Sequence, residues 1–142
     1  MPKTIRCFPA LAALLFLLPF AASAAMKGTE IRSARADGYA FRYELIDLLA
    51  GMKDHRGHDM SKMKSHHLMV YVTDPAGKTV RQAKVGYLVT GPDKAEQKVM
   101  AMFMEGGFGA DIDLKAKGAY KVLTKVADGD RTVKDEFTYA VK

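Results

Sequence analysis

The chain has 142 residues, of which 49% are hydrophobic, and its formal net charge is +6. This length suits one domain and leaves no room for two. The positive charge comes mainly from single, scattered lysines, without an arginine cluster or an interleaved aromatic platform, which argues against a nucleic-acid-binding protein.

The first 24 residues have the features of a cleaved secretory signal peptide. Lys3 and Arg6 precede an apolar run at 8–20, and the Ala-Ser-Ala sequence at 22–24 supplies the small residues that a signal peptidase accepts. A retained membrane anchor is the alternative, but the apolar run is shorter than the roughly 20 residues needed to cross a bilayer. We therefore predict a signal peptide at 1–24 and an exported, periplasmic protein without a membrane span after cleavage.

The mature chain, 25–142, alternates apolar and polar residues in short runs, which is typical of half-buried antiparallel strands. Turn-forming residues occur at 74–77, 91–93, 105–107 and 128–130. The apolar positions are Tyr39, Phe41, Tyr43, Leu45, Leu68, Val70, Val72, Val85, Tyr87, Val89, Ile112, Leu114, Tyr120, Val122, Phe137, Tyr139 and Val141. The pattern predicts one all-β domain, an immunoglobulin-like antiparallel β-sandwich of seven or eight strands, with the positions between Leu68 and Val122 in that series on its buried face.

A polar segment at 50–67 interrupts the alternation and is too long for an ordinary connection between strands. All four histidines of the chain fall within residues 55–67, together with two methionines. The only cysteine, Cys7, lies in the signal peptide, so the mature chain has no thiol and must fold without disulfides.

Imidazole nitrogen and thioether sulfur together form a ligand set that suits copper, because methionine favours Cu(I) and histidine accepts both Cu(I) and Cu(II). Zinc would use the histidines but not the methionines. His67 and Met69 share one strand face, opposite His66, and would form the rigid end of a site. The candidate metal ligands are His55, His58, Met60, Met63, His66, His67 and Met69. The alternative is a linker whose composition only suggests a metal site.

A second methionine group, Met100, Met102 and Met104, alternates along one predicted strand, so the three sulfurs face the same side. Methionine often fills irregular interiors, and we therefore interpret this group as core. If the opposite face, which begins with Val99, is the core instead, the methionines are exposed and available to a soft metal or a partner.

No catalytic constellation is present, and we do not expect an enzyme. Ser61 and Ser65 lie beside His and Asp residues, but a nucleophile needs a base held at a fixed distance by a framework. The glycine-rich stretch at 106–109 lacks the helix and lysine of a phosphate-binding loop, so it is expected to form a hairpin turn.

The strand motifs at 67–72, 74–80, 83–85, 107–114 and 118–122 resemble the YtkA-like family of exported immunoglobulin-like domains, over roughly 65–142. The stretch from Leu114 to Tyr120 is similar to a tyrosine corner. The resemblance implies that the protein is encoded near, or fused to, metal-handling and respiratory-oxidase assembly proteins. Separately, the His-Asp-Met-Ser-Lys-Met sequence at 58–63 is similar to the Met/His repeats of bacterial copper-resistance proteins.

These observations predict an exported, non-enzymatic domain that binds copper through its His/Met-rich segment and acts as a periplasmic metal chaperone or buffer. The alternative is an accessory or interaction module of an envelope complex, whose loop contacts a protein partner and no metal. Metal titration of the mature protein separates the two hypotheses.

Overall fold

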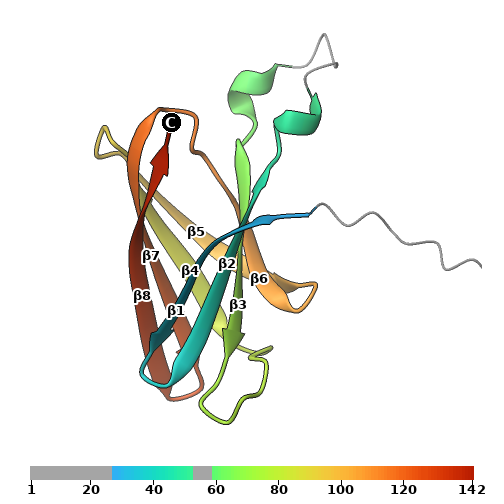
Figure 1. Ribbon diagram of the computed structural model, residues 1–142, viewed down its shortest axis with the longest axis vertical. Coiled ribbons are helices and arrows are strands. Elements are labelled where there is room, and N and C mark those ends of the chain that lie inside the picture. Colours follow the sequence, from blue (N-terminus) through green and yellow to red (C-terminus); the bar gives the residue numbers. More distant parts are fainter. Residues whose placement is uncertain (1–26, 53–58) are drawn as a thin grey trace, which may run out of the picture.

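The computed structural model describes residues 27–52 and 59–142 (Figure 1). Within these residues the protein is all-β, with eight antiparallel strands and two short 3-10 turns. The strands are β1 (Thr29–Ala36), β2 (Tyr39–Asp47), β3 (His66–Thr73), β4 (Lys84–Thr90), β5 (Glu96–Met104), β6 (Gly107–Ile112), β7 (Gly118–Asp128) and β8 (Arg131–Val141), and the turns are η1 (Ala50–Met52) and η2 (Met60–Lys62). The predicted signal peptide at 1–24 lies outside the described residues.

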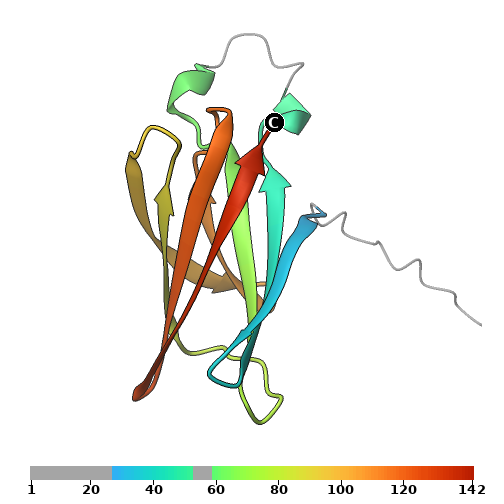
Figure 2. The same ribbon diagram turned by 60° about the vertical axis from the view of Figure 1, so that its left-hand side comes forward.

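The strands form one sheet in the order β1-β2-β3-β6-β5-β4-β7-β8, rolled nearly into a barrel (Figures 1 and 2). β5 joins the two halves, because it pairs with β4 up to Ala101 and with β6 from Met102 onward. The prediction of an all-β antiparallel fold is confirmed. The immunoglobulin-like sandwich is not confirmed, because β5 makes the strands continuous where a sandwich would have two separate sheets.

The two ends of the rolled sheet, β1 and β8, are joined by an ion pair. Arg32 on β1 donates from Nε and Nη2 to the two carboxylate oxygens of Asp135 on β8, at 3.0 and 2.9 Å. Hydrogen bonding to this carboxylate raises the pKa of Arg32. A bidentate pair of this kind fixes direction as well as distance, so it sets how the barrel closes.

The core lies inside the rolled sheet and matches the alternation of the sequence. Every position predicted to be buried between Leu68 and Val122 is at most 3% exposed. Tyr87 crosses the core and donates its hydroxyl to the carbonyl of Phe108 at 2.8 Å. Tyr120 donates to the carbonyl of Ala116 at 2.9 Å, which confirms the predicted tyrosine corner.

The hairpin between β5 and β6 fixes which residues of these strands face one another. Glu105 and Gly106 have positive φ values of 49° and 85°, which is the backbone of a two-residue hairpin turn. The turn places Met104 opposite Gly107 and Met102 opposite Gly109. Among the described residues no helix is long and apolar enough to span a membrane.

Candidate metal centre

The predicted metal ligands do not all lie together in the structure. His55 and His58 lie outside the described residues, as does the side chain of Met60, whereas Met63 is half-buried at the end of the segment. The structure thus leaves the predicted loop site untested, and the described ligands that remain lie mainly on β3.

His66 points away from the other two ligands of β3, because neighbouring residues of a strand face opposite sides. Its Nδ1 forms a hydrogen bond of 2.8 Å with the hydroxyl of Ser65, and the backbone N–H of Leu114 donates to that hydroxyl oxygen at 2.7 Å. His66 lines a depression with Leu45, Ile46 and Tyr139 at one end of the barrel. It therefore does not join His67 and Met69 in one site.

His67 is held in one orientation by the neighbouring strand. The register places it directly opposite Asp111 of β6, and its Nδ1 lies 2.6 Å from Oδ1 of that residue. A carboxylate can only accept here, so Nδ1 carries a proton, and in the neutral imidazole Nε2 has the free lone pair. This is the arrangement in which a carboxylate orients a metal-binding histidine.

Met69 lies beside this free nitrogen. A Cβ atom placed on Gly109 would come within 2.4 Å of His67 Nε2 and within 2.5 Å of Met69 Sδ. The nitrogen and the sulfur therefore lie side by side over the glycine, in space that any other residue would fill. Met69 is on the outer face of the sheet, yet it is only 3% exposed.

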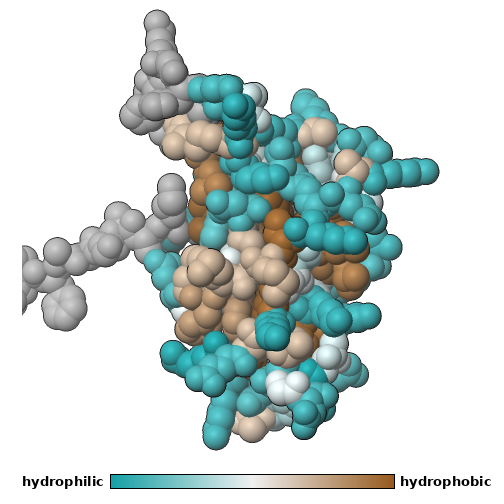
Figure 3. All heavy atoms as spheres, turned by 180° about the vertical axis from the view of Figure 1, so that it is seen from behind, coloured by the Kyte–Doolittle hydropathy of each residue, from teal (hydrophilic) through white to brown (hydrophobic). Residues whose placement is uncertain are grey.

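Met102 is the register partner of the same glycine on the strand at its other side. Gly109 is paired with Met69 across β3 and β6, and with Met102 across β5 and β6. Beyond this pair β5 leaves β6 to pair with β4, and a shallow depression lies where the strands part. Its lining includes His67, Asp111, Met100, Met102 and Met104. Figure 3 shows an apolar area on this side of the molecule.

The methionines of β5 are not core residues, and our core interpretation of them was wrong. Met100 and Met102 are 66% and 71% exposed, and Met104 is 36% exposed. The inward face of the strand is taken by Val99 and Ala101, which pack against the core. Each methionine instead faces a glycine of a neighbouring strand: Gly86, Gly109 and Gly107 respectively. The three side chains are thus exposed to solvent.

The sequence analysis missed Asp111 and Gly109 as parts of this candidate site, and it offered Met102 only in the alternative interpretation of the β5 methionines. The sequence did contain a signal for the pairing of Met102 with Gly109. A two-residue turn at Glu105 and Gly106 sets the alternate methionines of β5 opposite the alternate glycines of β6. The pairing of β6 with β3, which brings His67 and Met69 to this hairpin, had no local signal.

The donor set of the site is soft. It combines one imidazole nitrogen with thioether sulfurs, and no three His, Cys, Asp or Glu side chains converge within the described parts of the chain. Glu44 lies opposite Met69, but one of its oxygens pairs with Arg42 and the other accepts from Tyr71. Nitrogen with thioether sulfur suits Cu(I), whereas zinc or calcium would call for harder ligands.

Comparison with known proteins finds the same fold in a metal-binding protein. The crystal structure of FetP from a uropathogenic Escherichia coli strain, isolated after expression in the periplasm, superposes with a TM-score of 0.56 at 15% identity, covering 82% of this chain and 98% of FetP. A copper-bound variant of FetP gives a TM-score of 0.52 at 14% identity, covering 78% and 93%. At this identity the likeness establishes a similar fold.

No protein-family model and no curated protein matches the chain. The resemblance to the YtkA-like family therefore stays an interpretation of the strand motifs.

Proposed function

We propose that this is an exported, non-enzymatic copper-binding protein that holds Cu(I) on the outer face of β3, β6 and β5 and acts as a periplasmic chaperone or buffer. One observation carries the proposal: His67 Nε2 and Met69 Sδ lie side by side over Gly109, while Asp111 holds the other ring nitrogen. Met102 is the third donor, since it faces the same glycine. The copper-bound FetP of similar fold supports copper as the metal.

In this proposal the protein orients the metal ligands and catalyses no reaction. The hydrogen bond from Nδ1 to Asp111 fixes the tautomer of His67 and makes Nε2 a better donor. The exposed sulfur of Met102 gives the metal a way in and out, because it can move without disturbing the buried Met69. An open site of this kind suits a protein that receives and releases copper.

The His/Met-rich segment at 50–67 enters the proposal as a second group of ligands next to the strand site. Met63 and Ser65 lead directly into β3, so a metal held by His55, His58 or Met60 would have only a short distance along the chain to His67. Deleting residues 52–65 tests this part alone. Loss of one copper equivalent with the strand site retained is the expected result.

The main experiment is a Cu(I) titration of the mature protein in competition with a chromophoric chelator. His67→Ala and Met69→Leu are each expected to weaken Cu(I) binding at least tenfold, whereas His66→Ala, one residue away on the opposite face, leaves the strand site intact. Circular dichroism checks that each variant is folded. Equal affinities in all three variants would contradict the assignment.

Export is tested separately by the intact mass of the protein recovered outside the cytoplasm. We expect a mature chain that begins at Ala25, because the Ala-Ser-Ala sequence precedes it. A chain that still carries Met1 would contradict cleavage.

A non-metal interaction module is the second candidate function, favoured by the exposed apolar side chains of β5, Met100, Met102, Phe103 and Met104. The same titration separates the two functions. If the mature protein binds no Cu(I), the methionine face is a contact surface and the metal proposal fails.

A further inference from the structure

An apolar groove runs along the outer face of β4 and β7, on the other side of β5 from the metal centre. Leu88 and Leu123 face each other across these strands and are half-buried on the outside of the barrel. Gly86 and Ala127 leave the groove open, because neither has a large side chain to fill it. Leucine pairs of this kind on an outer sheet face indicate a contact surface.

Three lysines line this groove: Lys84, Lys98 and Lys125. In the register of the strands, Lys98 lies opposite Leu88, and Lys125 lies opposite Gly86. None of the three forms an ion pair with a carboxylate of the described residues, whereas Lys121, farther along β7, pairs with Glu136 at 3.3 Å. We call these three lysines and the two leucines the lysine groove.

Met100 connects the lysine groove to the metal centre. It lines both depressions, together with Val99. Its Sδ lies 3.3 Å from the position of a Cβ on Gly86, so the sulfur leans over the groove. Anything bound in the groove therefore contacts the methionine row that leads to Met102 and His67.

We propose that the lysine groove docks an acidic protein domain that exchanges Cu(I) with the metal centre; the inference rests on the proposed copper function. Charge complementarity argues for an acidic occupant with an apolar centre. A second copy of the chain would bring like charges together if it bound by the same face. An anionic membrane would satisfy the charges, but the shared wall with the metal centre favours a partner that carries copper.

The exchange is a ligand substitution with no redox step. A copper–sulfur bond to a thioether of the partner breaks as bonds to the exposed methionines and then to His67 Nε2 form, and copper remains Cu(I) throughout. The neutral imidazole, with its proton on Nδ1 toward Asp111, offers the Nε2 lone pair directly, so that form binds Cu(I) without losing a proton.

A synthetic peptide provides the probe: two leucines separated by glutamates, followed by a Met-x-x-Met pair loaded with Cu(I). Its control has glutamine at each glutamate position. Stopped-flow measurement of Cu(I) transfer to the mature protein at low salt should be at least about tenfold faster from the acidic peptide, and the advantage should fall as salt is added.

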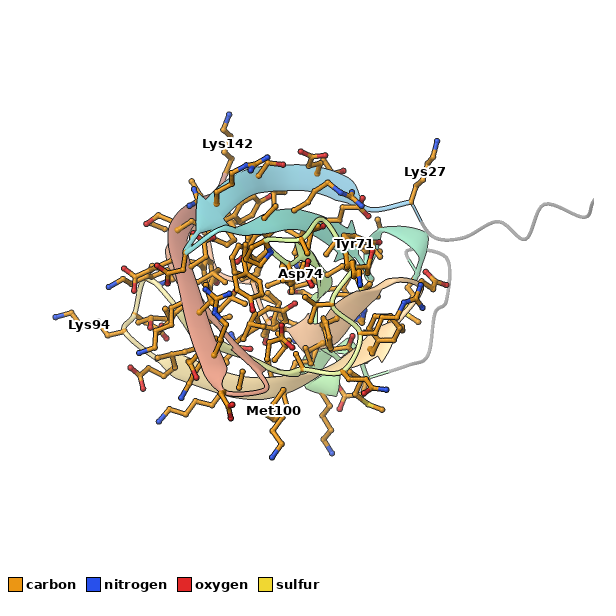
Figure 4. The ribbon with its side chains drawn as sticks, turned by 90° about the horizontal axis from the view of Figure 1, so that it is seen from below. Lys27, Tyr71, Asp74, Lys94, Met100 and Lys142 are labelled. Carbon is orange, nitrogen blue, oxygen red and sulfur yellow. The ribbon has the colours of Figure 1, made fainter. Side chains whose placement is uncertain are left out.

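Charge reversal locates the docking surface. The triple variant Lys84→Glu, Lys98→Glu and Lys125→Glu should abolish the tenfold advantage without changing the equilibrium affinity for Cu(I). The matched control reverses Lys27, Lys94 and Lys142, which point away from Met100 in Figure 4, and should keep most of the advantage. Replacing the three groove lysines by glutamine, which adds no repulsion, should give a smaller loss in the same direction.

The outcomes separate this inference from the proposed function. If both triple variants bind Cu(I) normally and take it from the acidic peptide at equal rates, the docking surface is wrong and the metal centre stands. If the groove variant instead loses binding only to anionic phospholipid vesicles, the surface is a membrane contact and the inference is overturned. If the parent protein binds no Cu(I), the proposed function is wrong, and this inference falls with it.

Discussion

The two faces of β3 show that burial alone does not make a side chain part of the core. Val70 on the inner face is fully buried, and Met69 on the outer face is only 3% exposed. Val70 is surrounded by apolar core residues, whereas Met69 lies beside an imidazole nitrogen over a glycine. The inner residue therefore contributes to stability, and the outer one is the proposed sulfur donor.

The largest expected effect is on the inner face. Val70→Asp places an unpaired carboxylate in the core and should unfold the domain, whereas Lys84→Asp on the outside of β4 should change the free energy of unfolding by less than about 0.5 kcal/mol. Thermal and urea unfolding of both variants provides the measurement. Equal effects would mean that the faces are assigned wrongly.

A milder pair of substitutions tests the same contrast. Val70→Ala should cost about 2 kcal/mol of unfolding free energy and leave Cu(I) affinity unchanged, because it only removes core volume. Met69→Leu should cost less than about 1.5 kcal/mol, since the two side chains have similar volumes, but it removes the sulfur. Urea unfolding should show the larger loss of stability for Val70→Ala, and chelator competition should show the larger loss of Cu(I) affinity for Met69→Leu. Parallel rankings would contradict a functional outer face.

Gly109 offers a way to close the site without removing a donor. An alanine Cβ would lie too close to His67 Nε2 and Met69 Sδ, so both side chain ends must move apart. Gly109→Ala should weaken Cu(I) binding about tenfold and cost about 1 kcal/mol of stability. Gly86→Ala is the matched control, since its Cβ would have ordinary or only slightly tight neighbours, Met100 Sδ at 3.3 Å and the Val99 carbonyl oxygen at 3.6 Å.

The orientation of His67 is tested by Asp111→Asn. Loss of the carboxylate should lower Cu(I) affinity by about 10-fold to 100-fold, because the amide no longer enforces one tautomer. Stability should change by less than about 1 kcal/mol, since Asp111 is 58% exposed and its pair with His67 lies at the surface. An unchanged affinity would show that the hydrogen bond only packs the two strands.

The smallest effect concerns high pH. Burial raises the pKa of Tyr87 well above its ordinary value of 10.0, so the unfolded chain loses this proton before the folded protein does. The folded state should therefore lose stability as the pH rises above 10, by up to about 1.4 kcal/mol per pH unit for this group. Tyr87→Phe should flatten this dependence. Tyr71→Phe on the outer face should flatten it less, since Tyr71 is half-exposed.

The alternation of apolar residues was sufficient to predict most strands and the whole buried face from Leu68 to Val122, because a period of two fixes which side chains share a side. It also placed His67 and Met69 together, opposite His66. It was not sufficient for the methionines of β5, because alternation shows that three side chains share a face but not which face is the inner one.

The sequence by itself determined the all-β class, the turn between β5 and β6, the core of β3 and the concentration of histidine and methionine before it. Only the tertiary structure decided that β6 lies between β3 and β5, and hence that His67 and Met69 meet over Gly109, with Asp111 bonded to His67 and Met102 paired with the same glycine. The physical reason is the distance along the chain over which each kind of signal acts. Periodicity and turn chemistry act over a few residues, whereas the pairing of β3 with β6 joins positions far apart in the sequence, 44 residues for His67 and Asp111. This pairing depends on how the whole sheet closes around its core.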